Sequence, residues 1–232
     1  MKVIILAAGA GKRLGSENIP KPLTKLINGQ SILEFQLERL KPHVSLDDII
    51  LVVGYQKEKI MEAFPNVLFV YNPDFAQENT AKSLLRALRK VNEDVLLLNG
   101  DVIFHLSVLE QLLTCASSCM LVNKESVGKE EVKYRTDEKH QIVDVSKEIE
   151  YAEGEALGIN FFSKNDIPLL ISCLERCSAK DYFEQAIQWA ILAGMKVQAK
   201  IVLASQCMEI DFPRDLQRAN QMLKLWEEGI ST

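Results

Sequence analysis

The stretch from Val3 to Leu14 constrains the fold more than any other, because an apolar strand there runs directly into a glycine-rich turn. Its sequence, VIILAAGAGKRL, places two glycines in the turn and a lysine and an arginine just after it. Such a turn brings backbone N–H groups and fixed positive charge against a phosphate chain. The rigid segment PKPL follows at Pro20 to Leu23. The beginning of the chain therefore predicts a phosphate-binding loop at the end of a buried strand.

Two well-known phosphate loops do not fit this turn. A dinucleotide-binding fingerprint needs a third glycine, where Leu14 stands. A Walker A loop needs glycine at the position of Leu6 and serine or threonine at the position of Arg13. The turn is therefore either a phosphate-binding loop of another class or an ordinary strand-to-helix turn with incidental basic residues.

Apolar runs alternate with helical patterns through the first half of the chain, which predicts βαβ units and a parallel sheet. Ser31 and Glu34 form a capping box that marks the beginning of the first helix. Ligands of such sheets bind beyond the carboxyl ends of the strands, so we expect the residues after Ala7, Tyr71 and Asn99 to face one crevice. The expected strands are Val3 to Ala7, Ile49 to Val53, Val67 to Tyr71 and Val95 to Asn99; the expected helices are Ser31 to Leu40, Gln56 to Ala63 and Thr80 to Arg89.

The second half has a different pattern, but we expect a single α/β domain of 232 residues. Residues 1–123 form its nucleotide half and residues 124–232 its acceptor half, and the charged stretch Lys124 to Lys133 is the only weak boundary. The expected elements are a hairpin of Glu131 to Thr136 and Gln141 to Ser146, a strand at Ala156 to Phe162, helices at Lys164 to Arg176 and Phe183 to Ala193, a strand at Val197 to Leu203, and a helix after Pro213.

Composition excludes several classes of protein. The formal net charge is -5, so no basic stripe is available for nucleic acid, and we expect a small-molecule partner. No apolar run approaches the roughly 20 residues of a membrane span, and Met1 leads directly into a core strand, so we expect a cytoplasmic protein.

Five cysteines are present, and the pairs Cys115/Cys119 and Cys173/Cys177 would lie one turn apart on helices. We interpret them as reduced, mostly buried thiols.

Two carboxylates follow apolar segments at positions that suit a metal ion. Asp101 ends the segment LLLNGD, where it offers the hard oxygen ligand that Mg²⁺ prefers, although an Asn-Gly-Asp turn alone would look the same. Asp211 lies in MEIDFPRDL, two residues after Glu209. Asp101 and Asp211 are thus candidates for a metal pair, with Glu209 either a further ligand through a local twist or a surface residue.

The combination LAAGxGxRL with PKPL downstream resembles the nucleotidyltransferases, which move a nucleoside monophosphate from an NTP onto a phosphorylated acceptor. The resemblance implies a Rossmann-like, GT-A-like, mostly parallel sheet flanked by helices, with a small β-hairpin insertion for acceptor binding. It makes Arg13 and Lys21 contacts of the NTP phosphates, and its second metal carboxylate lies in a similar E-I-D segment. The residues implied to bind the nucleotide here are Leu6, Ala7, Ala8, Gly9, Ala10, Gly11, Lys12 and Gly100.

The segment NPDFAQENTAKSLL, Asn72 to Leu85, separates branches of that family. It lacks the glycine-rich G-T-A segment of sugar-nucleotide transferases and resembles the phosphocholine cytidylyltransferase group of bacteria, which favours CTP. The resemblance gives Glu78, Asn79 and Ser83 a nucleotide contact. Asn79 or Thr80 can equally cap the following helix, and both interpretations can hold together.

The resemblance extends to the acceptor side. The segments VSKEI and GEALGINFFSK are similar to those around the acceptor phosphate, which gives Lys147 a phosphate contact; a snorkelling surface lysine is the alternative. DYFE resembles an aromatic and carboxylate cluster that holds choline, but Phe183 replaces the expected tryptophan and can instead be a core residue. The implied acceptor contacts are Lys147, Glu155, Phe162, Tyr182, Phe183 and Glu184.

The predicted reaction is Mg²⁺-dependent transfer of CMP from CTP to a small phosphate or phosphonate, with release of pyrophosphate. The sequence does not reveal the oligomeric state, for which a homodimer is the commonest assembly on general grounds. A phosphate monoester is already anionic at neutral pH, so no general base is needed, and no histidine is assigned a catalytic role. The alternatives are a sugar-1-phosphate nucleotidyltransferase using UTP, GTP or dTTP, a glycosyltransferase, and a non-catalytic nucleotide-binding module. A glycosyltransferase normally has a D-x-D motif, which Asp101-Val102-Ile103 lacks.

Overall fold

The structure is a computed structural model that describes residues 1–14, 19–125 and 127–229, without the side chain of Lys12. Its strands are β1 (Lys2–Ala7), β2 (Ile49–Val53), β3 (Leu68–Tyr71), β4 (Val95–Asn99), β5 (Val102–Phe104), β6 (Cys119–Val122), β7 (Lys133–Thr136), β8 (Ile142–Ser146), β9 (Gly154–Phe162), β10 (Gln198–Ile201) and β11 (Cys207–Glu209). Its α-helices are α1 (Ile32–Leu40), α2 (Lys57–Ala63), α3 (Thr80–Leu88), α4 (Leu106–Leu113), α5 (Ile167–Arg176), α6 (Phe183–Leu192) and α7 (Pro213–Glu227), and short 3₁₀ turns lie at Lys12–Leu14, Lys21–Leu23 and Leu46–Asp48.

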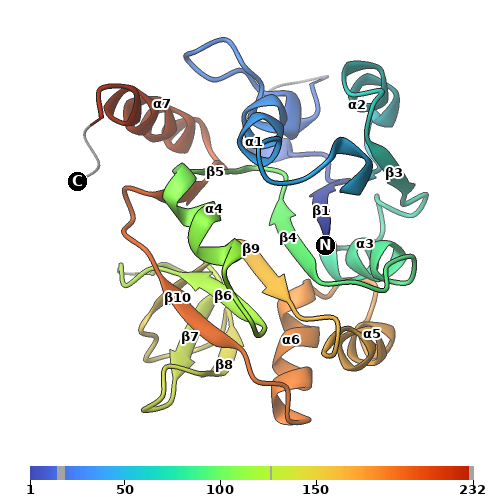
Figure 1. Cartoon of the computed structure of the whole chain (residues 1–232), viewed down its shortest axis with the longest axis vertical. Coiled ribbons are helices and arrows are strands. Elements are labelled where there is room, and N and C mark those ends of the chain that lie inside the picture. Colours follow the sequence, from blue (N-terminus) through green and yellow to red (C-terminus); the bar gives the residue numbers. More distant parts are fainter. Residues whose placement is uncertain (15–18, 126, 230–232) are drawn as a thin grey trace.

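A mostly parallel sheet in the order β10-β6-β9-β4-β1-β2-β3 forms the centre of the molecule (Figure 1). Strands β3, β2, β1 and β4 run in one direction, and β9 is antiparallel to both of its neighbours, β4 and β6. The hairpin β7–β8 is attached through β7 to the beginning of β9. The predicted fold class, a mostly parallel sheet flanked by helices with a hairpin insertion, is confirmed.

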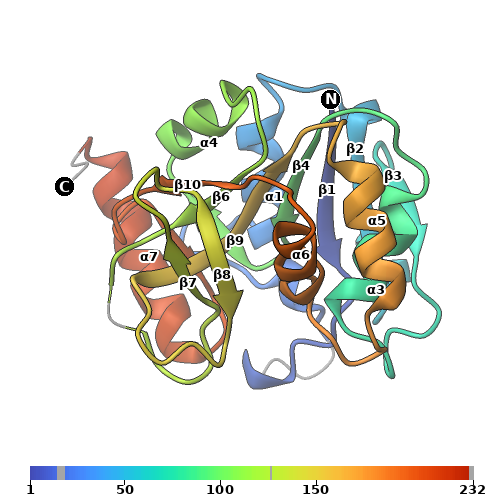
Figure 2. The same cartoon turned by 90° about the horizontal axis from the view of Figure 1, so that it is seen from below.

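Helices cover both faces of the sheet. Helices α3, α5 and α6 lie together on one face, as both views show, and their apolar side chains pack on one set of strand residues (Figures 1 and 2). Helices α1, α2 and α4 pack on the opposite set. Strands β1, β2 and β4 are therefore apolar along nearly their whole length, as expected for strands that are buried on both sides.

A third, smaller core joins α7 to α1 and to the antiparallel pair β5–β11. Ile210 belongs to this core, and its N–H donates to the carbonyl of Asp101 at 2.9 Å. The end of the chain is thereby attached beside the turn that follows β4, so two segments far apart in sequence lie side by side at one edge of the sheet.

Most predicted elements are present within one to three residues of their expected bounds. The capping box is confirmed, since Ser31 Oγ accepts from the N–H of Glu34 at 3.1 Å and the Glu34 carboxylate accepts from the N–H of Ser31. Four elements were not predicted: β5, α4, β6 and β11. Helix α4, LSVLEQLL, has its buried residues Val108, Leu109 and Leu112 at helical spacing, but it spans only two turns and follows directly after β5. The three strands have three or four residues each, which is too short for a clear alternation.

The two cysteine pairs differ. Cys173 lies on α5 and Cys177 at its end, as expected for a helical pair. Cys115 instead follows α4 and Cys119 begins β6, so the helical expectation is wrong for them, although their Sγ atoms lie 3.0 Å apart. All five cysteines are free thiols. In the described part of the chain, no helix combines the length and the apolar character needed to cross a membrane.

Candidate active site

A cleft of about 700 Å³ opens beyond the carboxyl ends of β1 and β4. Its walls come from the glycine-rich turn, the turn after β4, the ends of β6, β8 and β11, and the beginnings of β9, α6 and α7. The cleft gathers most of the predicted site: Leu6, Ala7, Gly9, Gly11, Arg13, Lys21, Gly100, Asp101, Lys147, Glu155, Tyr182, Phe183, Glu184, Glu209 and Asp211. Topology explains this gathering, because the carboxyl ends of parallel strands meet at one edge of a sheet.

Lys21 lies between the two predicted metal carboxylates. Its Nζ is 2.5 Å from Asp101 Oδ2 and 2.6 Å from Asp211 Oδ1. Burial disfavours the lysine charge, but the charges of Asp101 and Asp211 and their hydrogen bonds outweigh it, so the pKa of Lys21 is raised. Arg13 lies at the outer side of this group, 3.8 Å from Asp211 Oδ2. The predicted catalytic residues therefore form one charge cluster.

The local sequence explains how Lys21 reaches this position. Pro20 has an extended conformation and precedes the 3₁₀ turn Lys21–Leu23, which fixes the direction of the lysine. Gly11 has φ +58, and a Cβ there would lie 2.5 Å from the Cβ of Lys21. The glycine is thus required both by its backbone conformation and by its close approach to the lysine stem.

The turn after β4 is held by backbone hydrogen bonds. The N–H of Gly100 donates to the carbonyl of Leu6 at 2.9 Å, and a Cβ at Gly100 would lie 2.7 Å from that oxygen. Gln36 of α1 donates from Nε2 to the carbonyls of Asn99 and Val102, each at 2.8 Å. The sequence did not predict a role for Gln36; the signal was a polar residue at an apolar position of the helical pattern.

Glu209 lines the same cleft, so the alternative of a surface residue is wrong. No local twist is needed either, because residues two apart in an extended segment face the same side, and Ile210 between them points into the core. Asn99 Nδ2 donates to Glu209 Oε1 at 3.0 Å. Burial, together with the charges of Asp101, Asp211 and Glu155, raises the pKa of Glu209.

The residues present fit a divalent cation. Asp101 Oδ1 is buried and has no hydrogen-bond partner in the described part of the chain. Asp101 and Asp211 together carry more negative charge than the Lys21 between them compensates, and carboxylate oxygens are the ligands that Mg²⁺ prefers. No three His, Cys, Asp or Glu side chains of residues 1–14, 19–125 and 127–229 are grouped closely enough to hold an ion. Mg²⁺ commonly binds through one or two carboxylates plus substrate phosphates, so Asp101 and Asp211 suffice.

Several predicted nucleotide contacts do not line the cleft. Asn79 caps α3, with Oδ1 accepting from the N–H of Thr80 at 2.8 Å, so the capping interpretation is confirmed, and Thr80 lines the cleft in its place. Glu78 pairs with Arg86 at 2.9 Å, and buried Ser83 accepts from Asn72 Nδ2 at 3.0 Å. The structure therefore does not support nucleotide contacts for Glu78 and Ser83.

Three predicted contacts in the glycine-rich turn also do not appear in the cleft lining. Ala8 is buried in the core and Ala10 lies outside the cleft lining, while the side chain of Lys12 lies outside the described residues.

All but one of the residues predicted to contact the acceptor line the cleft. Lys147 Nζ lies 4.5 Å from the ring centroid of Tyr182, at the beginning of α6. Glu184 is buried, its Oε2 has no partner among the described residues, and burial raises its pKa to about 7. Phe183 lines the cleft but is 1% exposed, so it is mainly a core residue. The prediction that Phe162 contacts the acceptor is wrong, because Phe162 is fully buried and pairs with Val95, at the opposite end of β4 from the cleft.

Asn123, at the end of β6, is a residue that the sequence did not single out. Its Nδ2 donates to Glu155 Oε2 at 3.2 Å, and its carbonyl accepts from the hydroxyl of Tyr134 at 3.0 Å. Burial raises the pKa of Glu155 to about 7, although the bond from Asn123 opposes this rise. Asn123 therefore links the hairpin to the wall of the cleft and orients the Glu155 carboxyl.

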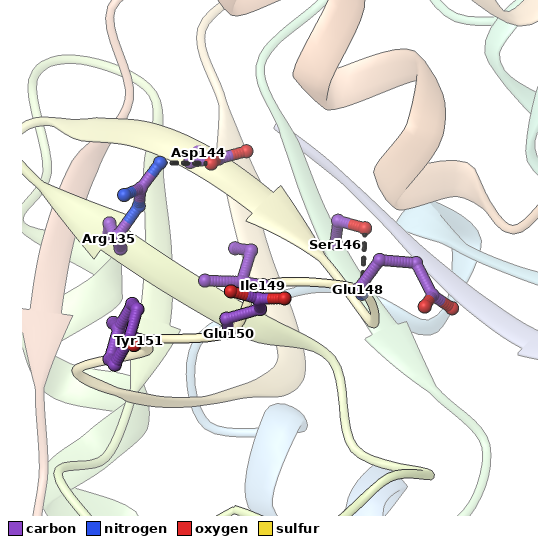
Figure 3. Close-up of a pocket in the computed structure, with 7 residues that line it drawn as sticks. All are labelled: Arg135, Asp144, Ser146, Glu148, Ile149, Glu150 and Tyr151. Atoms are coloured by element: carbon purple, nitrogen blue, oxygen red, sulfur yellow. Dashed lines mark hydrogen bonds and ion pairs between the residues drawn. The ribbon is translucent and has the colours of Figure 1, made fainter.

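A second, shallower hollow of about 360 Å³ lies on the hairpin and the loop after β8 (Figure 3). Arg135 and Asp144 form an ion pair of 2.7 Å at its edge, and Tyr151 stands exposed beside them. None of the predicted site residues lines this hollow. The chemistry of the chain is therefore concentrated in the larger cleft.

The sequence and the fold of this chain are similar to those of several known proteins. A family model described as the MobA-like NTP transferase domain matches residues 3–181. The CMP-5'-(3-aminopropyl)phosphonate synthase of Streptomyces rubellomurinus is 38% identical over 120 residues, which are 48% of this chain and only 19% of that protein. The choline-phosphate cytidylyltransferase of Streptococcus pneumoniae is 26% identical over 97% of this chain and 99% of its own length. The structure of the inositol-1-phosphate CTP transferase from T. maritima has the same fold, with a TM-score of 0.82, 23% identity, and coverage of 100% of this chain and 98% of that one.

Proposed function

The chain belongs to the family of MobA-like NTP transferase domains, and from this premise we propose that it transfers CMP from CTP to a small phosphate or phosphonate acceptor, releasing pyrophosphate. The observation that carries the proposal is the convergence of Asp101 and Asp211 on Lys21, at the edge where the glycine-rich turn ends. A module that only binds nucleotides has no need for a carboxylate pair at this place. The family resemblance drawn from the sequence is confirmed.

The nucleotide side of the cleft supports the binding of a triphosphate. Gly9 is exposed in the turn, and a Cβ there would meet no atom within 4 Å, so its backbone is open to a ligand. Arg13 and Lys21 supply positive charge beside it. We assign phosphate binding to the backbone around Gly9 and to these two cations.

Asp101 and Asp211 would hold a Mg²⁺ ion, which when bound neutralises phosphate charge and aligns the reacting oxygen with the α-phosphorus. Lys21, which lies beside both carboxylates, and Arg13, which also lines the cleft, would supply positive charge to the phosphates. The attacking oxygen is already anionic at neutral pH. This agrees with the cleft lining, in which no histidine occurs among the described residues.

The acceptor side favours a small acceptor with a charged head group. Lys147 lines the cleft and is our candidate for the acceptor phosphate, and the lining contains more carboxylates than basic side chains. The two relatives named above act, by their names, through CMP or cytidylyl transfer, and they support CTP as the donor. A phosphocholine-like or aminoalkylphosphonate acceptor, whose head group is cationic, fits this lining better than a sugar phosphate, whose sugar carries no charge.

The test is pyrophosphate release with each of CTP, UTP, GTP and dTTP, with and without Mg²⁺. The acceptors are phosphocholine, phosphoethanolamine, 2-aminoethylphosphonate, glycerol phosphate, inositol 1-phosphate and hexose 1-phosphates. We expect turnover with CTP, Mg²⁺ and an acceptor that carries a charged head group. Turnover confined to UTP, GTP or dTTP with a hexose 1-phosphate would instead identify a sugar-nucleotide enzyme. Binding of an NTP without turnover on any acceptor would identify a non-catalytic module.

A further inference from the structure

Gln36 is a fully buried polar residue on the core-facing side of α1. Its helical neighbours on that side, Leu33, Leu37 and Leu40, are apolar and buried. A methionine or leucine would fill this position without bringing polar atoms into the core. A buried amide costs free energy unless its hydrogen bonds are made, so its contacts should explain its presence.

The amide of Gln36 makes two hydrogen bonds, and both go to the turn that carries Asp101. Nε2 donates to the carbonyl of Asn99, two residues before Asp101, and to the carbonyl of Val102, one residue after it. Gln36 Oε1 has no partner among the described residues, so the side chain gains these two bonds at the expense of an unsatisfied oxygen. Both amide protons are therefore used to hold the two ends of one short turn.

Other contacts hold the same turn but act in different places. The N–H of Gly100 binds Leu6 of β1, and the carbonyl of Asp101 accepts from Ile210. Neither spans the turn from one end to the other. Gln36 alone, within the described residues, bonds to both sides of Asp101.

We propose that Gln36 is a positioning residue for Asp101: it holds the Asn99–Val102 turn closed and thereby directs the Asp101 carboxylate toward Lys21 and Asp211. It does not touch the reacting groups, and it acts on the rate through the placement of this carboxylate. The effect of Gln36 on the reaction rate rests on the function proposed above. Its effect on the conformation of the Asn99–Val102 turn does not.

The test compares Gln36→Met, which keeps length and apolar volume but removes both donors, with Gln111→Met, an exposed glutamine on α4 as the matched control. Loss of a residue that orients a metal ligand costs about 10-fold to 100-fold in metal affinity or activity. For Gln36→Met we therefore expect kcat to fall about tenfold and the Mg²⁺ concentration at half-maximal rate to rise by a similar factor, with an unchanged KM for CTP. Gln111→Met should match the wild type.

Amide hydrogen exchange supplies a readout that does not require activity. In Gln36→Met, peptides covering residues 99–102 should exchange at least about tenfold faster, while peptides of β1 and β2 keep their protection. If Gln36→Met fails to fold, Gln36→Asn retains a shorter donor, and we expect changes of the same direction and smaller size. Unchanged exchange in the turn, or a lower thermal stability with unchanged kcat and Mg²⁺ dependence, would overturn the proposal. Faster exchange in the turn of a wild-type-like fold, with no CTP turnover in the wild type, would leave Gln36 as the positioner and refute only the proposed reaction.

Discussion

Lys21 and Asp211 stand 190 positions apart in the sequence, yet the Nζ of one lies 2.6 Å from the Oδ1 of the other. The contact joins the segment after the glycine-rich turn to the segment between the last strand, β11, and the last helix, α7. Asp101 completes the group from the turn after β4, 2.5 Å from the same Nζ. Three segments that are far apart in the sequence thus meet at one charge cluster.

Removal of either carboxylate charge should abolish most of the activity while the fold persists. For Asp101→Asn and Asp211→Asn we expect kcat to fall by about 10³-fold, because the groups that hold the metal and stabilise the transferred phosphoryl charge are lost. The measurement is the rate of pyrophosphate release, with circular dichroism as the check on folding. Glu93→Gln, which removes an exposed carboxylate paired with the N-terminus, is the control. Near-normal activity in Asp101→Asn would exclude this residue from the site.

Replacement of Lys21 should make the stability of the protein depend on Mg²⁺. In Lys21→Met the Asp101 and Asp211 carboxylates lose their shared cation and repel each other, so the thermal midpoint should fall. Mg²⁺ should then raise the midpoint of the variant more than that of the wild type, because it restores positive charge between the two carboxylates. Thermal unfolding with and without Mg²⁺ measures this, and Lys25→Met, at an exposed ion pair with Glu34, is the control. Equal Mg²⁺ responses of the two variants and the wild type would contradict this prediction.

Gly158 should tolerate no side chain. It has φ +64, and a Cβ there would collide with Glu209 Oε1 and lie 2.6 Å from Asn99 Nδ2. Gly158→Ala should therefore displace the Asn99–Glu209 hydrogen bond and lower kcat by about 10-fold or more, besides the backbone strain of about 1 kcal/mol. Gly29→Ala, at φ +82, is nearer to this conformation and has open space around it, so it separates the backbone strain from the collision. Equal activities of the two variants would show that the collision has no effect on the site.

Glu184 should make the protein less stable as the pH rises toward neutral. Burial raises its folded pKa to about 7, so between the ordinary carboxyl range and that value the folded protein holds a proton that the unfolded chain has released. The free energy of unfolding therefore falls as the pH rises through this window. Glu184→Gln removes the titration and should gain about 2 kcal/mol relative to the wild type between pH 5 and pH 8. Urea unfolding at both pH values tests this, with exposed Glu148→Gln as the control; a constant difference between Glu184→Gln and the wild type at the two pH values would disprove it.

Local patterns in the sequence predicted most of the fold and the centre of the site. The strand and turn at Val3 to Leu14, the capping box at Ser31 and the carboxylates of LLLNGD and MEIDF are each visible within a few residues. Because parallel strands place their carboxyl ends together, these segments could be brought to one crevice without coordinates.

Other features could not be predicted because they depend on tertiary register. Phe162 lies on the right strand, but the antiparallel pairing of β9 with β4 takes it to the far end of the sheet. Glu78 and Ser83 lie in the right loop and helix, yet their partners Arg86 and Asn72 keep them within the protein. The helical pattern marks Gln36 as a polar residue at an apolar position, but its two partners, the carbonyls of Asn99 and Val102, depend on how α1 packs against the turn after β4.

The most direct test of the account is analysis of the product of the wild-type protein. CTP, Mg²⁺ and the charged-head-group acceptors would be incubated with the protein, and the products identified by ³¹P NMR and mass spectrometry. The account predicts pyrophosphate together with a CMP–acceptor conjugate joined by a P–O–P linkage, and no conjugate when Mg²⁺ is chelated. Absence of any conjugate from CTP, or conjugates formed only from another NTP and a sugar phosphate, would contradict it.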